Sequence, residues 1–245
     1  MKEALVYVQA ITIAELIVVA IDPVWGIVCH ILVLATLIAR SALISEHTNQ
    51  QLLLSVALVP LVRIISLSMP LADIPQIWWY PIIYAPLVVT AFIVMRLLNY
   101  KMEDVGLNFR LFPVQLAVAL TGFLFGVAEY YILRPQPLIA ELTWQEVWLP
   151  ALILIVSTGF VEEFIFRGVL QRTASRLFGW WGIVYVSLLF AVLHVGFLSW
   201  IDVIFVFVVA LFFGWVVKKT GSLLGVFLSH GITNSVLFLI APFFF

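Results

Sequence analysis

The segment Val161–Arg167, with the sequence VEEFIFR, places three ionisable side chains in a stretch that is otherwise apolar enough to span a membrane. A charged side chain at the centre of a spanning helix costs about 2.5–3.5 kcal/mol on insertion scales, and such residues usually face a bundle interior or a wet cavity. The segment therefore predicts a membrane protein in which other helices surround a polar site.

The composition of the whole chain agrees with this interpretation. Of its 245 residues, 64% are hydrophobic and 10% are charged, whereas a soluble domain averages about 45–50% apolar and about 25% charged residues. The net charge of −1 provides no basic patch for nucleic acid. The first apolar stretch carries Glu15 and no small-residue cleavage site, so we expect a retained helix and not a cleaved signal peptide. We predict an integral protein of the plasma (inner) membrane that contacts lipid and binds no nucleic acid.

Apolar runs of about 17–25 residues predict an all-α transmembrane bundle of about eight or nine spans, forming one integral domain. We expect a loop over the polar run Ser41–Gln51. Basic residues fall at the N-terminus and in alternate loops, which predicts a cytoplasmic N-terminus and an external C-terminus. The predicted helices cover about 4–20, 24–39, 52–69, 78–98, 112–133, 143–177, 181–196, 200–217 and 222–241.

Four polar residues of the last predicted helices lie at similar depths. At 1.5 Å per residue from the cytoplasmic turns, Glu162 lies about 24 Å and His194 about 20 Å along their helices. On the last helix, His230 and Asn234 lie at about 13 and 20 Å. Side chains from three helices therefore converge on one layer of the membrane.

The other intramembrane polar residues have a simpler interpretation. A single polar residue in a span often only joins helices by a hydrogen bond, and we interpret Glu15, His30 and Arg63 in this way. Asp202 lies near a helix start, where it is interfacial or a structural cap. Small residues of the last helix allow close packing against its neighbours. They are Gly225, Ser229 and Gly231.

Spacing along a regular α-helix divides the charged segment. Glu163 and Arg167 are four residues apart, so they share a face and can pair. Glu162 and Arg167 are five apart, or about 140° around the axis, which leaves Glu162 without the arginine. A buried carboxylate without a cationic partner suits a general base. We therefore predict that Glu162 performs the chemistry and that the other two residues form a structural pair.

The histidines allow two kinds of site. His194 lies at the depth to hold a water molecule against Glu162, and His230 and Asn234, four residues apart, can stabilise an oxyanion. Alternatively, Glu162, His194 and His230 could supply three zinc ligands with an open fourth position. The chain has no nucleophile elbow, no His-Glu-x-x-His and no cysteine pair. These residues leave open whether the site uses a metal.

Three short motifs follow one another on successive predicted spans. They are Glu162-Glu163-x-x-x-Arg167, Phe190-x-x-x-His194 and His230-x-x-x-Asn234. The series resembles the CAAX prenyl protease and bacteriocin-processing (CPBP) family of intramembrane proteases, formerly the abortive-infection family. The resemblance covers about 150–241. It implies a conical catalytic core of the last four helices, which we assign to 141–245, while 1–140 holds transmembrane helices without a specific motif.

The resemblance also implies roles for these residues. Glu162 would activate the hydrolytic water with the help of His194, and His230 with Asn234 would form the oxyanion site. The supporting residues would be Glu163, Arg167 and Phe190. The family is often described as metalloproteases, but its better-understood members resemble metal-independent, glutamate-based enzymes, and we expect the latter.

The function expected from both lines of reasoning is hydrolytic. We predict an intramembrane endopeptidase that cleaves a membrane-associated protein or peptide through a glutamate-activated water, in peptide or bacteriocin maturation or in self-immunity. The alternative is a non-catalytic immunity, scaffold or transporter-associated protein in which the polar layer only packs the bundle.

Overall fold

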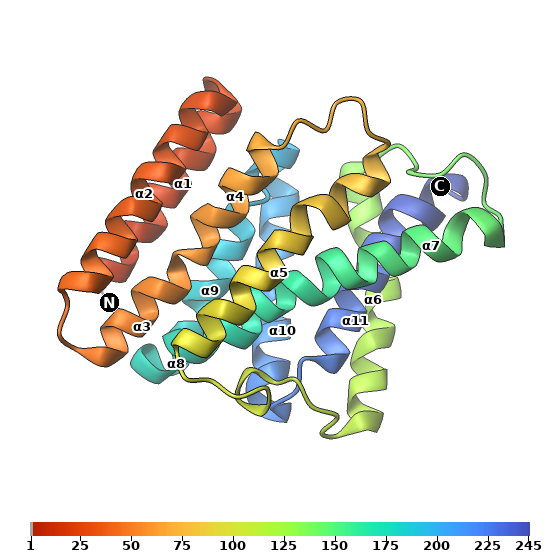
Figure 1. Cartoon of the computed structure of the whole chain (residues 1–245). Coiled ribbons are helices and arrows are strands. Elements are labelled where there is room, and N and C mark those ends of the chain that lie inside the picture. The colour runs from red at the N-terminus through yellow and green to blue at the C-terminus, as the bar shows by residue number, and fades with distance from the viewer. Residues whose placement is uncertain (1) are drawn as a thin grey trace.

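The computed structural model describes residues 2–245, which form helices joined by short turns and contain no strand (Figure 1). Within this range, eight helices are long and apolar enough to cross a membrane. A shorter apolar helix, Trp181–Phe197, occupies the position of the remaining predicted span. The predicted all-α bundle of about eight or nine spans is confirmed.

The helices follow the apolar runs of the sequence closely. Figure 1 shows α7 through α8 as one long oblique helix that runs beside α5. Between α7 and α8 the chain remains helical as two π-helical segments, Ile155–Glu162 and Phe164–Leu170, and a third, Val236–Ile240, extends α11. The α-helices are α1 (Lys2–Ala20), α2 (Pro23–Leu43), α3 (His47–Val56), α4 (Leu58–Ser68), α5 (Trp79–Leu97), α6 (Phe112–Leu133), α7 (Trp144–Leu154), α8 (Gln171–Phe178), α9 (Trp181–Val192), α10 (Trp200–Thr220) and α11 (Leu224–Ser235). Short 3₁₀ turns cover Gln76–Trp78, Glu103–Val105, Val195–Phe197 and Ala241–Phe243.

Local sequence signals set several of the helix ends. Asp22 caps α2 by accepting a hydrogen bond from the Val24 amide, and Pro23 occupies the first helical position, where its missing N–H costs nothing. Gly221 ends α10 with a φ of 68°, a left-handed conformation that glycine adopts without strain.

The predicted loop over Ser41–Gln51 is shorter in the structure, where only residues 44–46 are non-helical. Helix α2 continues to Leu43 and α3 begins at His47. The Ser41 hydroxyl donates to the Ile38 carbonyl within its own helix, and the Gln51 amide donates to the Leu98 carbonyl at the end of α5. Polar side chains here satisfy backbone groups, so the helices extend into the polar run from both sides.

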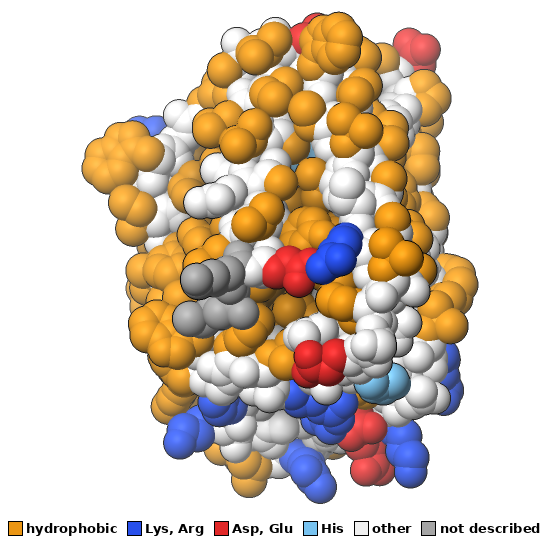
Figure 2. Space-filling view, turned by 90° about the vertical axis from the view of Figure 1, so that its left-hand side faces the viewer, with side chains coloured by type: hydrophobic (Ala, Val, Ile, Leu, Met, Phe, Trp, Pro, Cys, Tyr) orange, Lys and Arg blue, Asp and Glu red, His pale blue; other side chains and the backbone are white. Residues whose placement is uncertain are grey.

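A polar segment after α5 covers one end of the bundle. Asp104 accepts a hydrogen bond from the Lys101 amide, which lowers the pKa of its carboxyl group below the ordinary value, and nearby Arg172 acts in the same direction. The Arg172 guanidinium donates to Asp104 at 2.7 Å. In Figure 2, Lys and Arg side chains gather at the lower end of the face, below a broad hydrophobic surface. This distribution suits a bundle that exposes apolar side chains to lipid and basic ones at a membrane surface.

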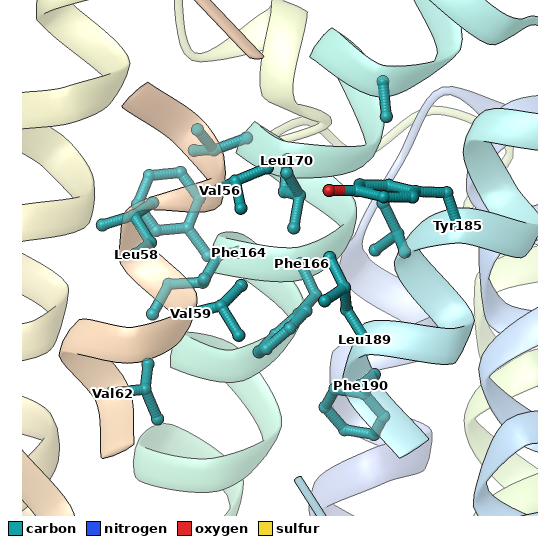
Figure 3. Close-up of a cluster of buried hydrophobic side chains, with 14 of the residues drawn as sticks. Val56, Leu58, Val59, Val62, Phe164, Phe166, Leu170, Tyr185, Leu189 and Phe190 are labelled. Carbon is teal, nitrogen blue, oxygen red and sulfur yellow. The ribbon is translucent and has the colours of Figure 1, made fainter. Parts of the chain in front are cut away.

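The hydrophobic core surrounds the long α7–α8 helix. Figure 3 shows Phe164 beside α4 residues such as Val59, and Phe166 beside Leu189 and Phe190 of α9. The Phe166 and Phe190 rings meet edge to face with centroids 4.9 Å apart. Both Phe164 and Phe166 are almost completely buried. Packing on both sides therefore fixes the helix that carries the charged segment.

Glycines bring α6 and α11 into close contact. A Cβ added to Gly126 would lie 2.6 Å from the Thr233 carbonyl oxygen, so only a glycine allows this backbone approach. On α11, a Cβ at Gly225 would meet Gln115, and one at Gly231 would meet Ile155. The predicted close packing of the last helix through small residues is confirmed.

We expect Gly126→Ala to destabilise the protein by about 1–3 kcal/mol, because the added methyl group overlaps backbone that cannot move alone. Activity falls as well, since α11 carries His230 and Asn234. Thermal unfolding in detergent measures the first effect. The control is Gly196→Ala, where an added Cβ meets nothing within 4 Å. Equal stability of the two variants would contradict the close-contact interpretation.

Candidate active site

The predicted site residues surround one cavity of about 240 Å³ inside the bundle. The four predicted catalytic residues all contribute to its wall, as do two of the three predicted supporting residues. The lining includes Glu162, Arg167, Phe190, His194, His230 and Asn234. Glu163 is fully buried and lies outside the lining.

Glu162 faces this cavity without contacting Arg167. The Tyr84 hydroxyl of α5 donates a hydrogen bond to its Oε1. Its Oε2 lies 3.8 Å from Nε2 of His230. The side chain is 15% exposed, which leaves part of the carboxylate open to a water molecule.

Glu163 holds two other site residues in place. Its Oε1 accepts hydrogen bonds from Arg167 Nη1 and from His230 Nδ1, each at 2.9 Å. Because a carboxylate can only accept, the His230 ring carries a proton on Nδ1 and directs Nε2 toward Glu162. The predicted pair of Glu163 and Arg167 is present. The link to His230 was not predicted, because it joins helices that are distant in the sequence.

Phe190 connects the charged pair to His194. The Arg167 guanidinium carbon lies 4.3 Å from the centre of the Phe190 ring, a cation–π contact. The Phe190 carbonyl oxygen lies 3.0 Å from His194 Nδ1, which must donate because a carbonyl only accepts. This leaves His194 Nε2 for the cavity. One phenylalanine thus packs the arginine and fixes the orientation of the histidine ring.

Asn234 is oriented by a threonine of the long helix. Its Nδ2 donates to Thr158 Oγ1 at 2.8 Å, and Thr158 in turn donates to the Leu154 carbonyl. An amide nitrogen has two N–H groups, so one remains for a bound group in the cavity. His230 and Asn234 lie one turn apart on α11 and both line the cavity.

The local helix geometry differs from the regular α-helix assumed in the sequence argument. The long helix is π-helical over Ile155–Glu162 and again over Phe164–Leu170. Hydrogen bonds in a π-helix join residues five apart, so an angle of 140° between Glu162 and Arg167 does not follow. The two glutamates still have different partners, because Glu163 binds Arg167 whereas Glu162 binds Tyr84. Interrupted helices of this kind are frequent at functional sites.

Several cavity residues lie outside the three sequence motifs. Tyr84 and Tyr80 come from α5, Glu129 from α6 and Arg63 from α4, all outside the three motifs. An isolated tyrosine in an apolar helix has no spacing partner. Only the packing of α5 against the long helix reveals Tyr84.

Glu15, His30 and Arg63 join helices by polar contacts, as expected, but they do so as one group. Arg63 binds Glu15 through Nε and Nη2, at 2.5 and 2.8 Å, and His30 Nε2 lies 3.0 Å from the same carboxylate. The three residues form one buried ion-pair cluster between α1, α2 and α4, which explains how each is tolerated in lipid.

Asp202 is not the cap of α10. Ser199 caps α10 by accepting a hydrogen bond from the Asp202 amide. The Asp202 side chain is fully buried, and its carboxylate oxygens have no hydrogen-bond partner among residues 2–245.

The zinc ligand set considered from the sequence does not come together in this geometry. Within residues 2–245, no three His, Cys, Asp or Glu side chains are arranged to hold a metal ion. His230 Nδ1 and His194 Nδ1 are both occupied by protein acceptors. Nε2 of each histidine and the Glu162 carboxylate therefore remain free, and these groups can position a water molecule.

A buried carboxylate, two oriented histidines and an amide surround one cavity of the bundle, and groups of these types can activate a water molecule. Residues 143–236 match the family model described as "Type II CAAX prenyl endopeptidase Rce1-like". The match confirms the resemblance to the CPBP family in the segment that carries the three motifs. No curated protein and no solved structure matches the chain.

Tyr84 provides a test of the site geometry. We expect Tyr84→Phe to lower kcat roughly tenfold, because a hydrogen bond to a charged group contributes about 1.5–3 kcal/mol and here fixes Glu162 Oε1. Steady-state kinetics of the purified protein measures the effect. Tyr131→Phe, on the exposed face of α6, is the control. Wild-type kcat in Tyr84→Phe would show that the hydroxyl does not position the carboxylate.

Proposed function

We propose that this protein is an intramembrane endopeptidase that cleaves a membrane-associated protein or peptide by attack of a water molecule activated by Glu162. The observation that supports it most strongly is the environment of Glu162. Its carboxylate faces the cavity, accepts a hydrogen bond from Tyr84 and lies 3.8 Å from His230. The neighbouring Arg167 is paired with Glu163 instead.

The reaction that we propose needs only groups of this chain and one water molecule. Glu162 accepts a proton from the water, whose oxygen attacks the peptide carbonyl carbon, and His194 Nε2 orients that water. The free N–H of Asn234 stabilises the oxyanion that forms, and His230 donates to it from Nε2 in the form of the ring that carries a proton on both nitrogens. The C–N bond then breaks, and the proton held by Glu162 passes to the leaving amine.

In this scheme, three of the reacting side chains are each held in position by another residue. His230 receives it from Glu163, His194 from the Phe190 carbonyl, and Asn234 from Thr158. Each partner fixes a ring or amide before substrate binds, and such preorganisation is what makes electrostatic stabilisation effective. The supporting residues therefore contribute to rate without contacting the reacting bond.

Cleavage of a quenched peptide library by the purified, reconstituted protein tests the proposal. We expect wild type to cleave and His194→Ala to be at least 100-fold slower, because it loses the group that orients the water. His47→Ala, an exposed histidine at the start of α3, is the matched control. If wild type and His194→Ala cleave equally, the proposed mechanism fails.

We further propose that the reaction is independent of a bound metal. The donor geometry around Glu162 supports this, as described above. Dialysis against EDTA and then 1,10-phenanthroline should leave kcat/KM within about twofold of the untreated enzyme. Loss of activity that zinc restores would overturn the proposal.

We propose a plasma-membrane location with a cytoplasmic N-terminus, and a role in peptide maturation or self-immunity. The alternation of basic loops supports the orientation, and the family resemblance supports the role. In the structure, the N-terminus and the C-terminus lie toward opposite ends of the bundle (Figure 1). Labelling of single cysteines placed in the loops of a Cys29→Ala background from one side of intact cells tests the orientation.

A further inference from the structure

Acidic side chains outnumber basic ones around the cavity once the partners of its two arginines are included. Two arginines line it, but each already has an acidic partner. Arg63 is held by Glu15 through two hydrogen bonds, and Arg167 is held by Glu163. The remaining acidic residues of the lining, Glu129 and Glu162, therefore have no arginine or lysine partner among residues 2–245.

Glu129 is the residue that the proposed reaction leaves unused. It lies on α6, is 7% exposed, and lines the cavity. Its carboxylate takes part in no hydrogen bond or ion pair within the described residues 2–245. The charged groups that act on it most strongly, Asp202 and Glu162, are also acidic. A carboxylate held in a bundle interior without a partner is expensive.

A ligand can remove this cost. A cationic group in the cavity would supply the charge that the chain itself does not place beside Glu129. The cavity is shared with Glu162, so such a group would belong to the substrate and lie close to the bond that is cleaved.

We propose that Glu129 is a specificity residue that binds a positively charged side chain of the substrate, of the lysine or arginine class, near the scissile bond. This inference rests on the proposed peptidase function. It adds a substrate preference that the three motifs do not contain, because Glu129 lies on a helix outside the segment matched by the family model.

The test uses the full-length protein in proteoliposomes and a quenched peptide library. Each position on either side of the scissile bond is lysine or its uncharged analogue norleucine. We expect wild type to prefer lysine at one position by roughly 10- to 100-fold in kcat/KM, as expected for a desolvated charge pair. In Glu129→Gln this ratio should fall to about one. Glu146→Gln, which removes an exposed carboxylate near the start of α7, should keep the wild-type ratio.

A second variant keeps the test decisive if Glu129→Gln does not fold. Glu129→Asp retains the charge but withdraws it by one methylene, so the lysine preference should shrink and remain above one. An unchanged ratio in either folded variant overturns the inference. Cleavage by wild type without any lysine preference overturns it while leaving the peptidase function standing. Absence of all cleavage overturns both.

Discussion

We expect Glu162→Gln to abolish peptide cleavage and to leave the fold intact. Glutamine keeps the size of the side chain and can still meet the Tyr84 hydroxyl, but it cannot accept the proton of the attacking water. Because general-base catalysis contributes about 10²–10⁴-fold, we expect kcat/KM to fall by about 10³-fold or more. Kinetics of the reconstituted protein gives this value, and its unfolding temperature gives the control.

Glu162→Gln can separate a loss of catalysis from a general loss of structure. Glu162 has no arginine partner, so its neutralisation leaves no buried charge unpaired. We therefore expect the unfolding temperature of Glu162→Gln to stay close to that of wild type. Cleavage at more than a tenth of the wild-type rate would show that another group activates the water.

Glu163→Ala is expected to lose stability as well as activity. The substitution leaves the Arg167 guanidinium, 2% exposed, without its carboxylate and removes the acceptor of His230 Nδ1. Breaking one side of a buried ion pair typically costs about 3–5 kcal/mol. Unfolding in detergent, followed by circular dichroism, measures the loss.

A double substitution provides the control for this prediction. In Glu163→Gln/Arg167→Met the buried charge is removed together with its partner, so stability should recover while His230 keeps an acceptor in the glutamine oxygen. If Glu163→Ala alone is stable and fully active, the two residues do not form the support that the structure indicates.

The positions of the long helices follow from apolar runs, and the sequence predicts them well. The run before Arg134-Pro135 predicts α6 at 112–133, the bounds that the structure has. Sequence cannot show that α2 and α3 extend into the polar run Ser41–Gln51, because side chains such as Gln51 bind backbone carbonyls of another helix. It also misses the π-helical segments, which change the angular positions of Glu162 and Arg167.

The site residues also differ in whether the sequence predicts them. Glu162, His194, His230 and Asn234 are visible in sequence because each belongs to a spaced motif on a polar layer. Tyr84 and Glu129 belong to no spaced motif, and only the packing of α5 and α6 shows that they reach the cavity.

Ion pairs between helices are the other feature that the sequence does not reveal. Glu15 and Arg63 are 48 residues apart, so no local spacing rule joins them. Their pairing decides the charge balance of the cavity, because it neutralises an arginine of the lining. The substrate preference proposed for Glu129 therefore depends on a contact found only in three dimensions.

The central claim is that this chain hydrolyses a peptide bond inside the bundle with water activated by Glu162. Mass spectrometry of library peptides incubated in ¹⁸O-labelled water with reconstituted wild type and Glu162→Gln tests it most directly. The account predicts fragments from wild type whose new carboxyl group carries one ¹⁸O, and no fragments from Glu162→Gln. Equal amounts of labelled fragments from both proteins, or none from folded wild type, would contradict it.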